Sequence, residues 1–326
     1  MKVLLTGATG FIGSHILESL RSRGLATAIL LRPTSSKRFI QRHLPEVELR
    51  FGFLNEPASL QAAMAGITHV IHCAGCTKAQ RISEFHQTNE IGTRNVVAAA
   101  NTQVTSMQRF VHISSLAAVG PAIPDKPARE SDTPRPVSAY GKSKLAAELE
   151  VRNHCRAPFV ILRPPAVYGP GDVEFLRLFK AVKNHLLPKI GRRQALSMVF
   201  VRDLAEAVVP CLEHPAAAGK TFFVANREIV SAQMIADEIA AQMHAWTVPL
   251  PLPAACFWAL CLAQEFRTRL TGKANILSMQ KWAEFRAVGW VCDPALLRQE
   301  LGYECATPLK AGIAASLNWY REQRWL

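Results

Sequence analysis

The amino-acid sequence predicts an α/β fold, a Rossmann-type, doubly wound parallel sheet with a smaller and mostly helical C-terminal part. Two observations support this prediction. Through the first half of the 326 residues, short apolar or β-branched runs alternate with helical patterns, which is typical of βαβ units. A glycine-rich turn follows the first of these runs directly, where a doubly wound sheet has its first strand-to-helix connection.

The individual elements follow from this alternation. Strands are expected at residues 3–5, 26–31, 47–51, 69–73, 110–113 and 159–162, and helices at 12–23, 58–64, 88–101 and 139–153. Two later runs, at 197–201 and 221–224, are predicted to return to the same sheet. We therefore expect a Rossmann domain over residues 1–165 and a discontinuous substrate-binding region over residues 166–326, which becomes a helical cap after residue 231.

Composition narrows the class of protein. With 49% hydrophobic and 19% charged residues, the chain is too apolar to be disordered. Its first apolar run is too short for a secretory signal, and its eight scattered cysteines are typical of reduced thiols, so we expect a cytoplasmic protein. The Cys73-x-x-Cys76 pair has no second pair at zinc-site spacing, so we expect no metal.

The chain is strongly basic and contains one long uncharged segment. The formal net charge of +13 raises the question of a polyanionic partner, but the basic clusters lack the interleaved aromatic residues of a single-strand nucleic-acid surface. We therefore expect no nucleic acid. The uncharged segment 247–263 is too short and too rich in proline to span a bilayer. We interpret it as a core helix, and a helix that lies on a membrane or walls an apolar pocket is the alternative.

The turn after the first strand is predicted to hold a pyrophosphate. It reads Thr6-Gly7-Ala8-Thr9-Gly10-Phe11-Ile12-Gly13 and opens a helix. Glycines allow the tight turn and the close approach of the backbone, while the helix N-terminus offers free N–H groups to an anion. The expected contacts are therefore Gly7, Thr9, Gly10, Phe11, Ile12 and Gly13.

The end of the second strand favours NADP(H) over NAD(H). An acidic residue there would bind the adenosine ribose of NAD, but this sequence has Arg32, with Lys37 and Arg38 close behind. A guanidinium can bind a 2′-phosphate in bidentate fashion, which a carboxylate would repel. For Lys37 and Arg38 the alternative is a solvated helix start.

A candidate proton-transfer group lies at the start of the predicted helix 139–153. Tyr140 and Lys144 are four residues apart, so their side chains leave from the same face. A phenol is a poor acid or base at neutral pH, and a nearby ammonium would lower its pKa. Ser114 and Ser115 end the fifth strand at the same edge of the sheet, and Asn89 lies on the preceding helix, where its amide could hold a water or a backbone carbonyl.

Taken together, these motifs resemble those of the extended short-chain dehydrogenases/reductases, and most of all the branch that holds 3β-hydroxysteroid dehydrogenases and dihydroflavonol-type reductases. The matching segments cover residues 1 to about 210: Thr6-Gly7-x-x-Gly10-x-x-Gly13, His72-Cys73-Ala74-Gly75, Asn89-x-x-Gly92-Thr93, Ser114-Ser115, Tyr140-x-x-x-Lys144, Leu162-Arg163-Pro164 with Val167-Tyr168-Gly169, and Phe200-Val201-x-Asp203. The chain departs from family patterns at Gly52-Phe53-Leu54, where relatives have an acidic residue, and at Val119, where many sugar-modifying relatives have tyrosine.

The resemblance implies a role for each matching residue. Tyr140 would be the catalytic acid/base, Lys144 would lower its pKa and hold the nicotinamide ribose, Ser115 would bind the reacting oxygen, and Asn89 would complete the relay. The cofactor would also contact Leu54, Cys73, Ala74, Gly75, Pro165 and Val167. Relatives commonly dimerise through the helices that correspond to 88–101 and 139–153, so a homodimer is expected.

Three functions are compatible with these motifs. The first is hydride transfer between NADP(H) and a hydroxyl or keto group of a hydrophobic, steroid- or flavonoid-like molecule, which the apolar segment 252–262 favours. The second is a nucleotide-sugar epimerase or dehydratase with bound NAD. The third is a non-catalytic nucleotide sensor or nucleic-acid binder, which the intact Tyr140 and Lys144 pair argues against.

Overall fold

The computed structural model describes residues 1–190, 194–252, 254–271 and 279–326 and confirms the predicted fold class. A seven-stranded parallel sheet has the order β10-β6-β5-β4-β1-β2-β3. Its strands are β1 (Lys2–Thr6), β2 (Ala26–Leu31), β3 (Glu48–Phe51), β4 (His69–His72), β5 (Arg109–Ile113), β6 (Phe159–Arg163) and β10 (Lys220–Phe223).

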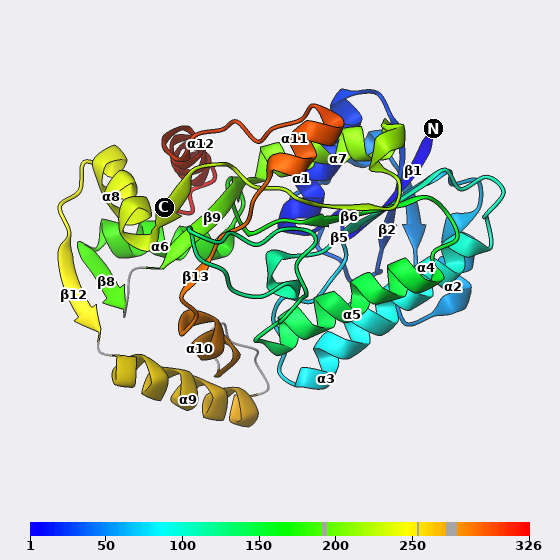
Figure 1. Ribbon diagram of the computed structural model, residues 1–326. Helices are drawn as coiled ribbons and strands as arrows, with labels where there is room; N and C mark the ends of the chain where they lie inside the picture. Colours follow the sequence, from blue (N-terminus) through cyan, green and yellow to red (C-terminus); the bar gives the residue numbers. More distant parts are fainter. Residues whose placement is uncertain (191–193, 253, 272–278) are drawn as a thin grey trace.

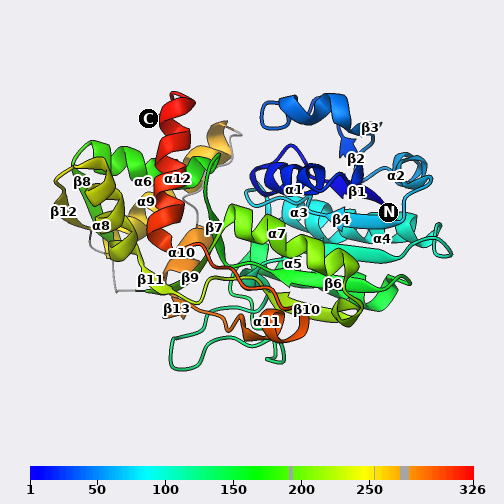
Figure 2. The same ribbon diagram turned by 90° about the horizontal axis from the view of Figure 1, so that it is seen from above.

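Helices cover both faces of this sheet, as expected for a doubly wound fold (Figure 1 and Figure 2). The covering helices are α1 (Phe11–Ser22), α2 (Pro57–Met64), α3 (Ile82–Phe85), α4 (Gly92–Asn101), α5 (Ala139–His154), α7 (Val201–Glu213) and α11 (Ala295–Leu301). Alternate residues of a strand enter opposite cores. Val3 and Leu5 pack toward α1 and α7, and Leu4 packs toward α2, α4 and α5.

The second region is built around a small separate sheet, in the order β11-β9-β13 with β7 beside β9. Its strands are β7 (Ala166–Tyr168), β9 (Ala195–Phe200), β11 (Ile229–Ser231) and β13 (Gly289–Trp290). A two-stranded sheet pairs β8 (Leu186–Ile190) with β12 (Val248–Leu252). The helices of this region are α6 (Val173–Lys183), α8 (Ala232–Met243), α9 (Ala254–Thr271), α10 (Met279–Phe285) and α12 (Leu309–Glu322).

Of the two strands expected to return to the main sheet, one does and one does not. The run at 221–224 is found as β10, which pairs with β6 at the edge of the sheet. The prediction for 197–201 was wrong, because among the described residues β9 pairs with β7, β11 and β13 of the small sheet and with no strand of the main sheet. Apolar β-branched runs predict strands but not partners, and β10 already occupies the edge at β6.

Two helix predictions also need correction. The segment expected as one helix over 88–101 belongs to a longer helical run with three parts. These are α3, a π-helical turn at His86–Ile91, and α4. The segment 247–263 is not simply a core helix, since Trp258, Leu260 and Leu262 of α9 are exposed. Among the described residues, no helix combines the length and apolarity needed to cross a membrane.

Three histidines are buried in the central strands. Burial lowers the pKa of His69 to about 4 and that of His72 to about 3, and it also lowers the pKa of His112, well below the ordinary value. The rings of His72 and His112 lie side by side on β4 and β5, with centroids 5.4 Å apart. Neither ring nitrogen of His112 has a hydrogen-bond partner among the described residues.

These histidines predict that acid destabilises the fold. Because each folded pKa lies below the unfolded value of about 6.5, their contribution to stability is complete above about pH 6.5 and is lost as the pH falls toward the folded values. We expect the free energy of unfolding, measured by urea titration, to fall by about 1.4 kcal/mol per pH unit per histidine. His112→Gln should remove one such increment, and His154→Gln, at an exposed position, should not. Equal pH slopes in both variants and the parent would contradict this prediction.

Candidate active site

The turn between β1 and α1 has the geometry of a phosphate cradle. Gly7 has φ +77°, and a Cβ on it would lie 2.6 Å from the backbone nitrogen of Ala74. A Cβ on Gly13 would lie 2.1 Å from the carbonyl oxygen of Gly7, so both positions require glycine. No side chain caps the N-terminus of α1, where Gly10 is exposed. The uncapped N–H groups of this first turn fit the pyrophosphate of a dinucleotide.

A directed chain of hydrogen bonds ties this turn to the loop after β4. The Ala74 N–H donates to Thr6 Oγ1 at 3.2 Å, and Thr6 Oγ1 lies 2.8 Å from His72 Nδ1. His72 Nε2 lies 3.0 Å from Thr93 Oγ1, whose proton goes to the carbonyl oxygen of Asn89 at 2.6 Å. Because the Thr93 hydroxyl donates its proton to Asn89, His72 must donate to Thr93 through Nε2 and accept from Thr6 at Nδ1. This is a neutral imidazole, in agreement with the low pKa of His72.

Asn89 continues this chain toward the catalytic candidates. It lies on the π-helical turn, where its side chain is buried. Its Oδ1 accepts from the Cys76 N–H at 2.7 Å, and its Nδ2 donates to the Cys76 carbonyl and to Ser143 Oγ. Ser143 Oγ in turn donates to the Tyr140 carbonyl at 2.8 Å. The amide therefore fixes both the loop after β4 and the first turn of α5, as the π-helical turn allows.

The structure brings Tyr140, Lys144 and Ser115 together at the carboxyl edge of β5. Tyr140 is partly buried, and the Ser115 side chain lies close enough to lower the pKa of its phenol. Lys144 is buried, and its Nζ donates to the carbonyl of Ile113 at 2.7 Å. Ser114, by contrast, is buried and donates to Glu148 Oε1 at 2.5 Å. Ser115 is thus the serine beside Tyr140, whereas Ser114 binds Glu148 of α5.

Burial sets the pKa values of this pair. It raises the pKa of the Tyr140 phenol to about 12, against the opposing effect of the nearby Ser115 side chain. It lowers the pKa of Lys144 to about 8, against the nearby Cys73 and Glu148, which raise it. The sequence argument expected the ammonium to lower the phenol pKa, but the direction is opposite, because burial penalises the charged form of both groups. At neutral pH the pair is therefore a phenol and an ammonium.

The remaining expected cofactor contacts lie along the same edge of the sheet. Arg32 follows β2 and is exposed, with its N–H bonded to Ser35 Oγ at 3.1 Å. Cys73 and Gly75 follow β4, and Pro165 and Val167 follow β6. Leu54 accepts from Asn95 Nδ2 through its carbonyl and packs on Gly92 of α4. Lys37 and Arg38 lie in a loop, not at a helix start, and Arg38 stacks over the Trp325 ring at 4.6 Å.

Sequence reasoning missed a buried ion pair beneath the site. Arg163 Nε and Nη2 donate to Glu148 at 2.9 and 2.6 Å, and both side chains are almost fully buried. Glu148 lies one helical turn after Lys144, so Tyr140, Lys144 and Glu148 share one face of α5. The sequence did indicate this placement, because Glu148 follows Lys144 by four residues just as Lys144 follows Tyr140. The carboxylate joins α5 to β6, and also to β5 through Ser114.

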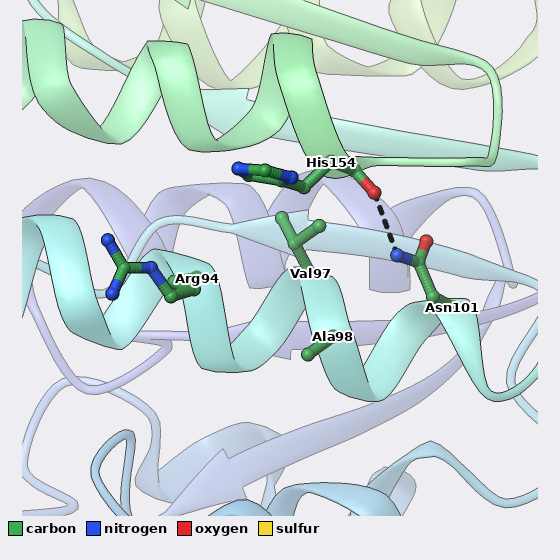
Figure 3. A pocket seen from close by; sticks show the side chains of 5 residues that line it. All are labelled: Arg94, Val97, Ala98, Asn101 and His154. Atoms are coloured by element: carbon green, nitrogen blue, oxygen red, sulfur yellow. Dashed lines mark hydrogen bonds between the residues drawn. The ribbon is translucent and has the colours of Figure 1, made fainter.

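A separate hollow of about 370 Å³ lies between α4 and α5, at the ends opposite to Asn89 and Tyr140. Figure 3 shows the side chains that line it, with Asn101 Nδ2 bonded to the carbonyl of His154 at 2.8 Å. Its lining residues are Arg94, Val97, Ala98, Asn101 and His154. It is remote from the phosphate cradle. The homodimer expected through these two helices stays a prediction.

Comparison with known proteins decides the family. The model of the NAD dependent epimerase/dehydratase family matches residues 3–225. The chain belongs to this family. Its members are the extended short-chain dehydrogenases/reductases that the motifs resemble, and the protein is an NAD(P)-dependent oxidoreductase of that type. This overturns the interpretation of the chain as a non-catalytic protein.

Individual relatives include both reductases and epimerases. The chain is 30% identical to a ceramide reductase from Caulobacter vibrioides, over 99% of this chain and 96% of the relative. It is 28% identical to a UDP-glucose 4-epimerase from Vibrio cholerae, over 84% and 86%. Among solved structures, the Thermus thermophilus UDP-glucose 4-epimerase complex with NAD superimposes with a TM-score of 0.78 at 22% identity, over 98% of this chain and 99% of that one. Both chemistries therefore occur on this fold.

The buried ion pair yields a stability prediction. Glu148→Ala would leave the Arg163 guanidinium buried without its partner, so we expect the free energy of unfolding to fall by about 3 to 5 kcal/mol. Arg227 and Glu304 form an exposed control pair, with side chains 51% and 38% exposed, and Glu304→Ala should cost less than about 1 kcal/mol. Urea unfolding of the three proteins measures both values. Similar losses in the two variants would show that the buried pair has no special role.

Proposed function

We propose that this oxidoreductase transfers a hydride reversibly between NADP(H) and a hydroxyl or keto group of a hydrophobic small molecule, with Tyr140 as the acid/base. The observation that supports this most directly is the placement of Tyr140 beside Ser115 at the carboxyl edge of β5, one helical turn from buried Lys144. The ceramide reductase relative supports a hydrophobic substrate. NADP(H), when bound on the cradle at Gly7 to Gly13, supplies or accepts the hydride.

Each residue of the site has a defined task in this proposal. Tyr140 Oη, protonated at neutral pH because of burial, donates its proton to a carbonyl oxygen held by Ser115 Oγ. The Lys144 ammonium stabilises the phenolate that this transfer leaves. Asn89 fixes the Tyr140 backbone through Ser143, so the phenol is positioned before the substrate arrives.

Substitution of the phenol tests this assignment. Tyr140→Phe removes only the transferable proton, so reduction of a panel of steroid, flavonoid-like and long-chain ketones by NADPH should slow by about 100-fold or more. The affinity for NADPH, measured by calorimetry, should stay nearly unchanged. Tyr303→Phe is the matched control, because the Tyr303 hydroxyl bonds the Asp203 carbonyl instead of facing the site. Normal turnover in Tyr140→Phe would end the assignment.

We also propose that Arg32 selects NADP(H) over NAD(H). It is an exposed cation at the carboxyl end of β2, where a carboxylate would accept the ribose hydroxyls of NAD. Arg32→Asp should shift the ratio of NADPH to NADH affinity toward NADH by about 10- to 100-fold, as expected for the loss of a charge-assisted hydrogen bond. Arg156→Asp, at the opposite edge of the sheet, makes the same charge change and should leave the ratio alone. An unaltered ratio in Arg32→Asp would mean that another residue reads the phosphate.

A nucleotide-sugar epimerase is the second candidate, supported by the Vibrio cholerae relative. An epimerase must keep its cofactor through the cycle, so this function requires NAD that co-purifies and does not exchange. It also requires isomerisation of a UDP-sugar without net redox. Mass spectrometry of the purified protein followed by incubation with UDP-glucose separates the two candidates.

A further inference from the structure

Helix α9 exposes apolar side chains where a surface helix normally exposes polar ones. Its inner face is formed by Phe257 and Cys261, which are buried, and Phe257 packs on Trp282 and Phe285 of α10. Among the side chains described from 255 to 266, the exposed ones are all uncharged and apolar or thiol-bearing: Ala255, Cys256, Trp258, Ala259, Leu260, Leu262, Ala263 and Phe266. Trp258, Leu262 and Phe266 recur every four residues, so they form one stripe.

The neighbouring two-stranded sheet also has an apolar exposed face. Val248 and Leu250 alternate along β12, so their side chains leave on one face, and Trp246 lies two residues before the strand. Leu186 is the register partner of Val248 on β8 and is exposed beside it. Trp246, 65% exposed, is held in place by the stacked ring of His185 at 4.0 Å. Figure 1 shows β8, β12 and α9 near one another at the end of the molecule away from the central sheet.

The chain around these elements holds most of the net positive charge of the protein. Residues 175–200 contain six Lys and Arg and no Asp or Glu, and residues 244–288 contain five Lys and Arg against two Glu. Together they supply nine of the thirteen net positive charges. Lys180 and Lys183 lie exposed at the C-terminal end of α6, immediately before β8. An apolar surface flanked by cations matches the chemistry of an anionic lipid surface.

We propose that this surface, formed by the stripe of α9 and the apolar face of β8 and β12, docks the protein on anionic bilayers. The apolar side chains enter the interfacial region, with Trp246 and Trp258 at the headgroup level, and the surrounding Lys and Arg attract the acidic headgroups. Docking is peripheral. It brings the second region of the protein, of which α9 and β12 are part and which the sequence predicts to bind the substrate, next to molecules dissolved in the bilayer.

Charge distinguishes this occupant from a second copy of the chain. Two copies that met through this surface would bring their two positive regions together, and like charges oppose association. An anionic bilayer instead offers an apolar interior beneath a negative surface. Nucleic acid would satisfy the charge but leave the apolar side chains without a partner.

Vesicle sedimentation with the full chain, in the absence of substrate, tests the proposal. The protein should bind vesicles of phosphatidylglycerol and phosphatidylcholine and bind pure phosphatidylcholine much more weakly. Trp258→Gln/Phe266→Gln should lower the partition coefficient by at least about tenfold. The control pair Phe51→Gln/Val104→Gln changes two apolar side chains of comparable exposure in the Rossmann domain and should leave binding intact. Because all four positions are exposed, the thermal midpoint should change little, and circular dichroism checks this.

Quenching by brominated lipid locates the contact. It should disappear in Trp246→Phe/Trp258→Phe and persist in Trp319→Phe/Trp325→Phe. The proposal is overturned if anionic vesicles are not bound, if the α9 pair binds them like the parent, or if the α9 pair instead abolishes a dimer or RNA binding. Since no substrate is present, failure of the proposed reaction would leave these results unaffected. Conversely, the comparison of Tyr140→Phe with the parent on detergent-solubilised ketones needs no vesicles, so failure of the docking would leave the test of the reaction unaffected.

Discussion

One chain of buried hydrogen bonds holds the active site together, and the rest of the site depends on it. It runs from the Ala74 N–H through Thr6, His72 and Thr93 to Asn89, and from there through Ser143 to the backbone of Tyr140. Each donor has one acceptor and each link fixes the direction of the next, so the chain has one consistent arrangement. Because a buried polar group without a partner costs free energy, the members are mutually dependent. The turn that would hold the pyrophosphate and the helix that carries the phenol are thereby set relative to each other by side chains from β1, β4, α4 and α5.

The electrostatics of the site follow from the same burial. Desolvation raises the Tyr140 pKa and lowers that of Lys144. At neutral pH a neutral phenol therefore lies next to an ammonium. Beneath them, Glu148 is committed to Arg163 and Ser114, so its charge is neutralised within the core rather than directed at the reacting atoms. The site therefore places a neutral phenol beside a cation, at the edge of the sheet where the glycine-rich turn also lies.

The two halves of the protein differ in how much apolar surface they expose. The Rossmann half buries both faces of its sheet and leaves only scattered apolar side chains exposed. In the second half, β8, β12 and α9 have exposed apolar side chains among their described residues, while the chain around them is basic. A hydrophobic substrate of the proposed kind dissolves poorly in water and collects in membranes. A surface that is both apolar and cationic would bring the enzyme to it without a membrane-spanning helix.

The sequence by itself determined the fold class, the places of the six leading strands along the chain and the positions of Gly7, Tyr140 and Lys144. These depend on local periodicity and on steric requirements at single residues. Tertiary structure alone decided which partner each element takes. The run at 197–201 is a good strand by composition, yet it pairs in a separate sheet. Arg163 and Glu148 are ordinary in sequence and become a buried ion pair only when α5 lies on β6. Likewise, the direction of the Tyr140 pKa shift reflects burial, which no spacing of residues reveals. Contacts between residues distant in the chain determine how far each ionisable group is buried and which strand or side chain becomes its partner. These contacts form only when the whole chain has folded.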